Sequence, residues 1–332
     1  MQQQGNNFVG ASANKSASSS ASAMGKEAFT IFPALMVKPK NTMQKLALLL
    51  LLLGWSQTTQ AQTNYIPYHQ RMVDIEQLIL QEAFSEAEVA ILQLFTDYEP
   101  AFADDLLLAA QLCALNGHDE RSLDFLEKAL QKGVEIEFIK SIPALQTLLQ
   151  TTTWKDIEER LPRLRYDYAT SINMDLAAEF RKRFQIEQAA KGTDRYPEVV
   201  QDNFDRIIEV IAKYGFPGEE LIGYYTGNIT VTLLHQPYAF SLLQEELYEA
   251  LKNGQLPPGD FLNFYVFESR KISTLYDHNL HAPQGIQLPH YNFLTQTDTD
   301  SSKVRNARYQ FGIGLMRFSE KMEIGKKYGI RF

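Results

Sequence analysis

Residues 104–131, DDLLLAAQLCALNGHDERSLDFLEKALQ, decide the fold of this chain. Apolar residues recur with helical spacing on both sides of Gly117, and this pattern predicts two helices, over 104–116 and 119–131. Gly117 and Gly133 stand directly after the two patterns, where glycine commonly ends a helix. The stretch is therefore predicted to form a helical hairpin.

A similar pair of helices precedes this hairpin. We predict one helix over 74–83 and a second over 85–98, where Ser85 and Glu88 have the spacing of a capping box. Pro100 then separates this pair from the next one. The first half of the chain is thus expected to contain four helices in two hairpins.

A shift of 34 residues superposes the two hairpins. It places Ile79 on Cys113, Val89 on Leu123, Ile91 on Phe125 and Leu92 on Leu126. Helix pairs with this period are typical of tetratricopeptide repeats, which bury their apolar faces by stacking on neighbouring pairs. Residues 62–160 therefore resemble a tetratricopeptide-like helical region, although the large aromatic residue that such repeats carry early in the first helix is missing. Two ordinary helical hairpins are the alternative.

Residues 161–332 are predicted to form a second helical domain. The stretch 219–236 contains β-branched residues, but its length and flanking residues favour a buried helix. The predicted fold class is all-α, with tetratricopeptide-like helical hairpins packed on a second helical domain. Helices are expected over 175–188, 202–214, 219–236, 238–253, 260–275 and 303–321. In the helix 202–214, one face is expected to hold Phe204, Ile207, Ile208, Ile211 and Tyr214. In the helix 238–253, the outward residues are expected to be Gln244, Glu245, Glu249 and Lys252.

Four short segments in the second half carry a resemblance to a known family. They are Lys213-Tyr214-Gly215-Phe216-Pro217, Leu233-Leu234-His235, Glu268-Ser269-Arg270 with Tyr276, and Arg308 with Gly312-Ile313-Gly314-Leu315. In this order and spacing, residues 200–320 resemble a family of exported helical bacterial proteins known only as a domain of unknown function. The family has Gln-His where this chain has Leu234-His235, and Asp-Arg where it has Ser269-Arg270. The resemblance implies a helical fold and supplies no established activity.

The candidate ligand-binding residues are His235, Arg270, Tyr276 and Asn279. Each stands at a predicted helix end or loop edge, where side chains gather around pockets. One interpretation is a polar pocket for an anionic or peptidic ligand, with Arg270 as a bidentate clamp. The other interpretation is a buried polar network that fixes the packing of the helices.

Residues 43–61 have the order of a secretory signal peptide. Met43-Gln44-Lys45 is followed by the apolar run 46–55, and the segment ends on the small residue Ala61. A membrane-spanning helix needs roughly 20 apolar residues, so this shorter run predicts a cleaved export signal. Residues 1–42 lack a periodic apolar pattern and are interpreted either as a disordered leader or as a mis-assigned segment. We favour the second interpretation, in which translation begins at Met43. The protein is expected to be exported, periplasmic or extracellular.

Charge and cysteine content restrict the partners. The chain holds 32 basic and 40 acidic residues, a formal net charge of −8. Five lysines and one glutamate precede residue 62, so the exported chain would carry −12. The absence of a basic stripe with interleaved aromatic residues argues against nucleic acid, and an acidic surface would be repelled by anionic lipid, so no membrane partner is expected after signal cleavage. The single cysteine, Cys113, excludes an internal disulfide and is predicted to be buried and inert.

No metal or cofactor is expected. His278, His281 and His290 lie close to Asp277 in sequence, but they lack the rigid i, i+4 helical spacing of zinc sites. The favoured function is a non-enzymatic one: an exported helical scaffold whose hairpins bind a protein or peptide partner. The alternative is an enzyme of unknown class with a polar pocket around His235 and Arg270.

Overall fold

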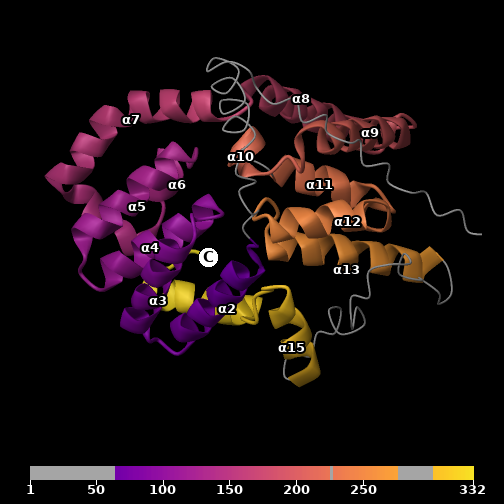
Figure 1. Cartoon of the computed structure of the whole chain (residues 1–332). Helices are drawn as coiled ribbons and strands as arrows, with labels where there is room; N and C mark the ends of the chain where they lie inside the picture. The colour runs from indigo at the N-terminus through magenta and orange to yellow at the C-terminus, as the bar shows by residue number, and fades with distance from the viewer. Residues whose placement is uncertain (1–63, 225–226, 276–301) are drawn as a thin grey trace, which may run out of the picture. The chain divides into compact units, whose positions relative to one another are not determined.

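The computed structural model describes residues 64–224, 227–275 and 302–332, which belong to one compact unit, Gln60–Phe332 (Figure 1). Fourteen α-helices and two short 3-10 helices form the regular structure of these residues, and no strand occurs among them. The predicted all-α class is confirmed. The predicted leader and signal peptide, 1–42 and 43–61, lie outside the described residues.

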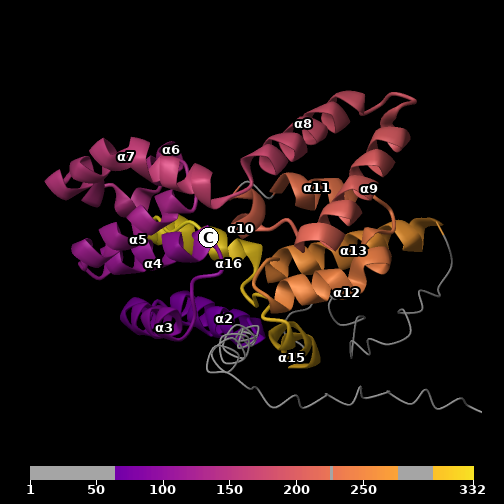
Figure 2. The same ribbon diagram turned by 45° about the horizontal axis from the view of Figure 1, so that its top comes forward.

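The first four helices are α2 (Ile66–Leu80), α3 (Phe84–Asp97), α4 (Ala103–Leu115) and α5 (Asp119–Gln131). All four were predicted, but α2 begins earlier than expected because a proline is tolerated in the first turn of a helix. Successive helix pairs lie one beside the next, and α3 packs on α4 between them (Figure 2). The resemblance to tetratricopeptide repeats remains a prediction.

The first hydrophobic core extends beyond these hairpins. It is completed by α6 (Ile136–Lys140), the 3-10 turns Pro143–Leu145 and Leu148–Gln150, α7 (Thr152–Ser171) and α16 (Phe318–Tyr328). Trp154, at the start of α7, is 1% exposed in this core, and its backbone N–H donates to the side-chain hydroxyl oxygen of Thr151, which caps the helix. The boundary expected at residue 160 falls within α7, and Leu164 beyond it still packs into the first core.

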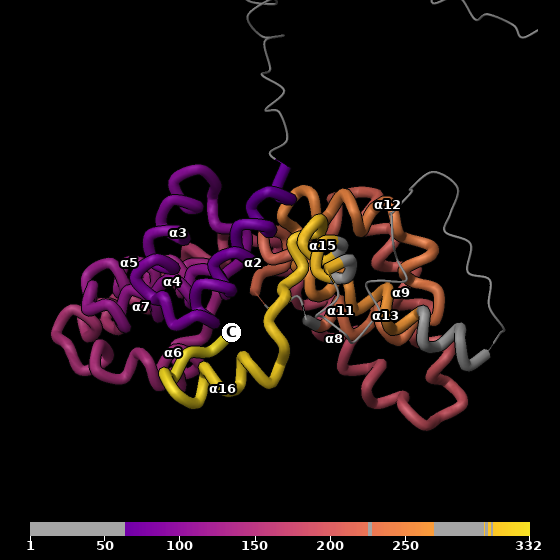
Figure 3. The backbone as a smooth tube through the Cα atoms, turned by 90° about the horizontal axis from the view of Figure 1, so that it is seen from below, coloured from indigo at the N-terminus to yellow at the C-terminus, as the bar shows by residue number. Residues whose placement is uncertain are grey.

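The second core is built by the later helices. These are α8 (Met174–Ala190), α9 (Tyr196–Tyr214), α10 (Glu219–Ile222), α11 (Gly227–His235), α12 (Ala239–Lys252) and α13 (Pro258–Leu275). Phe311 and Ile313, which follow α15 (Ser302–Gln310), complete this core. Both α15 and α16 pack against α2, so the last helices lie beside the first one (Figure 3). Within the described ranges, no helix is both long enough and apolar enough to cross a membrane.

Two helices predicted as continuous are each divided. The stretch 219–236 forms α10 and α11, because Gly223 has a φ of +86° and ends the short first helix. The stretch 303–321 forms α15 and α16, because Gly312 has a φ of +64° in the connection between them. Both glycines occupy the left-handed region that other residues avoid. The β-branched residues of α11 are helical, as predicted.

Several predicted helix faces are wrong in detail. In α9, Ile208 and Tyr214 are exposed, whereas Asn203 is buried because its side chain donates to Glu187. In α12, Gln244 is buried whereas Glu245 and Glu249 are exposed, and we attribute this difference to the kink at Leu243. Periodicity alone cannot anticipate a kink or a buried polar partner.

The capping box predicted from Ser85 and Glu88 is also wrong. Helix α3 begins at Phe84 without a side-chain cap. Glu88 is 2% exposed and binds the next hairpin instead, accepting from Asn116 at 2.8 Å and Arg121 at 2.6 Å. The carboxylate therefore joins two hairpins rather than closing one helix end.

The predicted burial of Cys113 is confirmed. Its thiol donates to Glu88 at 3.5 Å, and burial together with this carboxylate raises the thiol pKa to about 12. Because the thiolate is the reactive form, we expect no reaction of the native protein with an aromatic disulfide reagent at pH 8, and full reaction in guanidinium chloride. Labelling within minutes under native conditions would contradict this packing of α3 on α4.

Candidate functional site

A cavity of about 300 Å³ lies where α2, the amino-terminal end of α4, α10 and the start of α13 meet. We take it as the candidate site because polar side chains from separate elements face one cavity. The polar or charged residues in its lining are His69, Glu76, Asp104, Asp105, Glu219 and Lys321, and the apolar ones include Met72, Phe102, Leu108 and Phe332.

Asp105 is held by a buried tyrosine. The Tyr68 hydroxyl donates to Asp105 Oδ2 at 2.6 Å, and the Ala101 N–H donates to the tyrosine oxygen at 3.3 Å. Burial raises the pKa of Asp105 to about 7, and the bond from Tyr68 opposes this only in part. Near neutral pH, the carboxyl group is thus divided between its neutral and charged forms.

Glu219 approaches the same place from α10. Its Oε2 accepts from the Ala103 N–H at 2.9 Å, at the amino-terminal end of α4. Burial raises the pKa of Glu219 to about 8, and Asp104 and Asp105 raise it further while Lys132 lowers it. The field of one lysine does not offset the cost of burying this carboxylate.

Two more acidic residues face the cavity. Asp104 accepts from the Tyr224 hydroxyl at 2.7 Å. Glu76 accepts from Lys321 Nζ at 2.7 Å through Oε1, whereas its Oε2 is inaccessible to solvent and has no hydrogen-bond partner among the described residues. Such an unsatisfied oxygen is costly unless a ligand or water reaches it.

His69 forms part of the wall but supplies no positive charge. Its Nε2 donates to the Leu251 carbonyl oxygen at 3.0 Å, and its ring stacks on Phe102 with 6.0 Å between centroids. Burial lowers the pKa of His69 to about 4. The ring is therefore neutral at neutral pH, and the cavity keeps an excess of carboxyl groups.

Glycines allow the connection after α15 to close the cavity. A Cβ on Gly312 would lie 2.1 Å from His69 Cβ, and one on Gly314 would lie 2.7 Å from Glu76 Oε2. Both belong to the Gly312-Ile313-Gly314-Leu315 segment. The glycines of this segment thus have a physical role, which is the close approach of the backbone to α2.

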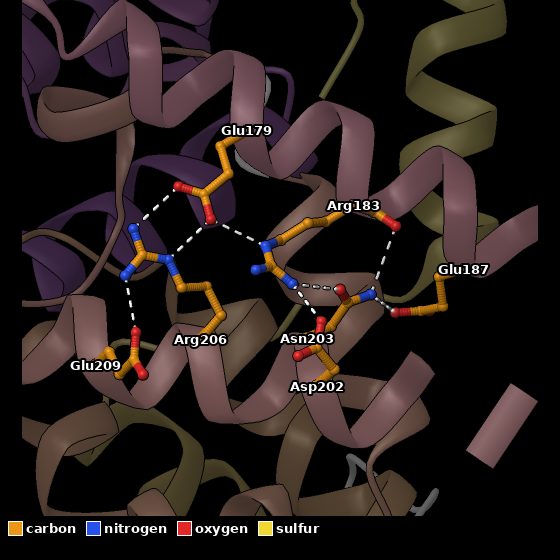
Figure 4. A network of polar contacts seen from close by, with 7 residues as sticks. All are labelled: Glu179, Arg183, Glu187, Asp202, Asn203, Arg206 and Glu209. Carbon is orange, nitrogen blue, oxygen red and sulfur yellow. Dashed lines mark hydrogen bonds and ion pairs between the residues drawn. The ribbon is translucent and has the colours of Figure 1, made fainter. Parts of the chain in front are cut away.

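The sequence-predicted residue His235 lies in a different cluster, where it contacts Glu187, a member of the polar network drawn in Figure 4. Its Nδ1 pairs with Glu187, whose side chain is fully buried, and Asn203 donates to the other carboxylate oxygen at 2.7 Å. Asn203 also contacts Arg183, which pairs with Glu179 at 2.9 Å. These bonds join α8, α9 and α11, so the contacts of His235 favour the buried-network interpretation over the pocket.

The other predicted site residues cannot be placed beside His235. The side chain of Arg270 and the whole of Tyr276 and Asn279 lie outside the described residues, as does the histidine group 278–290 considered for zinc. In the described parts of the chain, no group of three or more His, Cys, Asp or Glu residues is placed to hold a metal ion.

Sequence reasoning missed Asp105 and Glu219 as site residues. Both stand at the start of a helix, where acidic residues are common because they interact favourably with the helix dipole. The pair Asp104-Asp105 before an apolar run is the only local signal, and it does not distinguish a site from an ordinary helix start.

Comparison of the chain with protein-family models, curated proteins and solved structures finds no match. Both resemblances therefore remain predictions. The functional argument rests on the geometry and electrostatics of the cavity.

Proposed function

We propose that this protein is a non-catalytic binding scaffold whose cavity receives a cationic group of a peptide or protein partner. The observation that carries the proposal is the pair Asp105 and Glu219, whose pKa values burial raises to about 7 and about 8. Burial favours the protonated form of a carboxyl group at neutral pH when no positive charge nearby compensates the lost hydration. An ammonium or guanidinium group entering the cavity would supply that charge and restore both carboxylates.

The size and walls of the cavity suit one extended side chain. A volume of about 300 Å³ is at the lower end of ligand pockets and too small for a folded element. Met72, Phe102 and Leu108 provide apolar contact for the stem of a lysine or arginine, while the carboxyl groups receive its charged end. A partner would thus be held by a single inserted residue.

An enzyme is the second candidate, and the same pKa values favour it. A carboxyl group with a pKa near 7 can donate a proton at neutral pH, which is the requirement for a general acid. This candidate is centred on Asp105 and Glu219 rather than on His235.

The proposal is tested with two small probes, Nα-acetyl-lysine methylamide and its uncharged analogue Nα-acetyl-norleucine methylamide. Calorimetric titration at pH 8.5 should detect the lysine probe and show at least about tenfold weaker binding of the norleucine probe. Affinity for the lysine probe should fall at pH 6, because the carboxyl groups must then lose protons to pair with the cation.

The matched variants are Glu219→Gln and Glu220→Gln. Glutamine at 219 can still accept from the Ala103 N–H, so folding should be preserved while affinity for the lysine probe falls about tenfold. Glu220 is an exposed neighbour, and its replacement should leave affinity unchanged. Equal binding of both probes, or no effect of Glu219→Gln, would refute the proposed cation site.

A further inference from the structure

A groove of about 840 Å³ runs along α16 on the surface of the protein. Its apolar lining comes from Phe138, Pro143, Phe318, Met322, Ile330 and Phe332. Phe318 is 79% exposed, Met322 58% and Phe332 41%. Single exposed apolar residues are ordinary, but several that line one groove are typical of an interaction surface.

The exposed residues form one stripe of the helix. Phe318, Met322 and Lys326 follow each other at intervals of four, which places them on the same face of α16. Ile324, on the opposite side, is 5% exposed in the first core. Helix α16 therefore has apolar residues on two faces. One face is buried in the first core, and the other is exposed and also carries Lys326.

The charged residues of the groove carry a small excess of positive charge. Lys326, Arg331 and Glu323 line it, and neither cation has an ion-pair partner among the described residues. Their neighbours are neutralised, since Lys321 pairs with Glu76 at 2.7 Å and Lys327 with Glu82 at 2.6 Å. On a chain with a net charge of −8, two cations against one carboxylate beside an apolar floor give the groove a charge opposite in sign to that of the whole chain, which favours an acidic partner.

One wall of the groove is held rigidly. The buried side chain of Gln111 donates to the Arg331 carbonyl oxygen at 3.0 Å and accepts from the Arg331 N–H at 2.7 Å. The Ala144 N–H donates to the Gly329 carbonyl oxygen at 3.2 Å, and Ile330 is 3% exposed. A fixed wall reduces the ordering cost that binding must otherwise overcome.

We propose that this groove binds a segment of a partner protein that combines acidic residues with large apolar ones. A carboxylate of the segment would pair with Arg331, whose planar guanidinium can hold it through two hydrogen bonds. Its apolar side chains would lie on Phe318 and Met322, and methionine adapts its shape to such contacts. The groove adjoins the proposed cation cavity, since Lys321 and Phe332 line both, but Asp105 and Glu219 line only the cavity.

The test measures fluorescence polarisation of a labelled acidic peptide, acetyl-Glu-Phe-Asp-Leu-Phe-Glu-amide, with the corresponding lysine-substituted peptide for comparison. The acidic peptide should bind at least about fivefold more tightly than the basic one at low salt, and this preference should shrink at 0.5 M NaCl because salt screens exposed charges. Arg331→Gln and Met322→Ser should each weaken binding of the acidic peptide several-fold.

The control variant is Val89→Ser, at a 68% exposed apolar residue on α3, and it should leave the affinity unchanged. Glu219→Gln should also leave it unchanged, so a failure here is distinct from a failure of the cavity proposal. Equal binding of the two peptides, or no effect of Met322→Ser, would overturn the inference. Concentration-dependent self-association that Phe318→Ser abolishes would assign the groove to a second copy of the chain and overturn it as well.

Discussion

His235→Ala is expected to lower the free energy of unfolding by about 1–3 kcal/mol, since removing one hydrogen-bond partner of a buried carboxyl group leaves that group partly unsatisfied. The carboxylate that remains would be Glu187, which has no solvent exposure and would keep only the bond from Asn203. Urea unfolding at pH 7, followed by circular dichroism, measures the change. A loss of this size would identify His235 as part of the packing of α8, α9 and α11.

The matched control is His118→Ala. This histidine also contacts a buried carboxylate, Glu88, at 2.8 Å, but its own side chain is 53% exposed and Glu88 keeps its bonds from Arg121 and Asn116. We expect a loss below about 1 kcal/mol for this variant. If His235→Ala costs no more than His118→Ala, the network interpretation is wrong and the pocket around His235 becomes the better one.

The helices were predictable where a local pattern determines them. The stretch 104–131 folds as the helical hairpin that the apolar spacing and Gly117 indicate. Helix α5 buries one face, whereas α4 is buried on all sides over residues 106–113. The divisions at Gly223 and Gly312 were missed, since an isolated glycine is tolerated within a helix and its φ is fixed only by the tertiary contacts around it. Gly312, for example, is required by the close approach to His69.

The candidate site was not predictable from local patterns. Asp105 and Glu219 are far apart in the sequence, and they come together because Glu219 of α10 accepts from the Ala103 N–H at the amino-terminal end of α4. His235 was correctly singled out as a polar residue at a helix end, but its partner Glu187 lies 48 residues away on another helix. A periodic pattern does not predict which helices contact each other, so it cannot distinguish a buried polar network around His235 from a ligand pocket.

The second large effect expected is on pH dependence: the combined variant Asp105→Asn, Glu219→Gln should be more stable than the unchanged protein at pH 8.5. In the unfolded chain both carboxyl groups have pKa values near 4, whereas in the folded protein the values are about 7 and about 8. The folded protein thus binds more protons than the unfolded chain between these limits, and its stability falls as the pH rises through this interval.

Thermal unfolding should be compared between pH 6.5 and 8.5. Below pH 6.5 His69 acts in the opposite direction, because its lowered pKa of about 4 makes stability rise with pH. Within the chosen interval, the Tm of the unchanged protein should fall and level off above pH 8, while the variant should show a much weaker dependence. At pH 8.5 the variant should gain about 2 kcal/mol, or about 4–8 °C in Tm, because it no longer has to bury two carboxylates. Parallel profiles of Tm against pH for the two proteins would show that Asp105 and Glu219 have ordinary pKa values. The two buried carboxyl groups would then not need a bound cation to be ionised, and the cation-binding proposal would lose its basis.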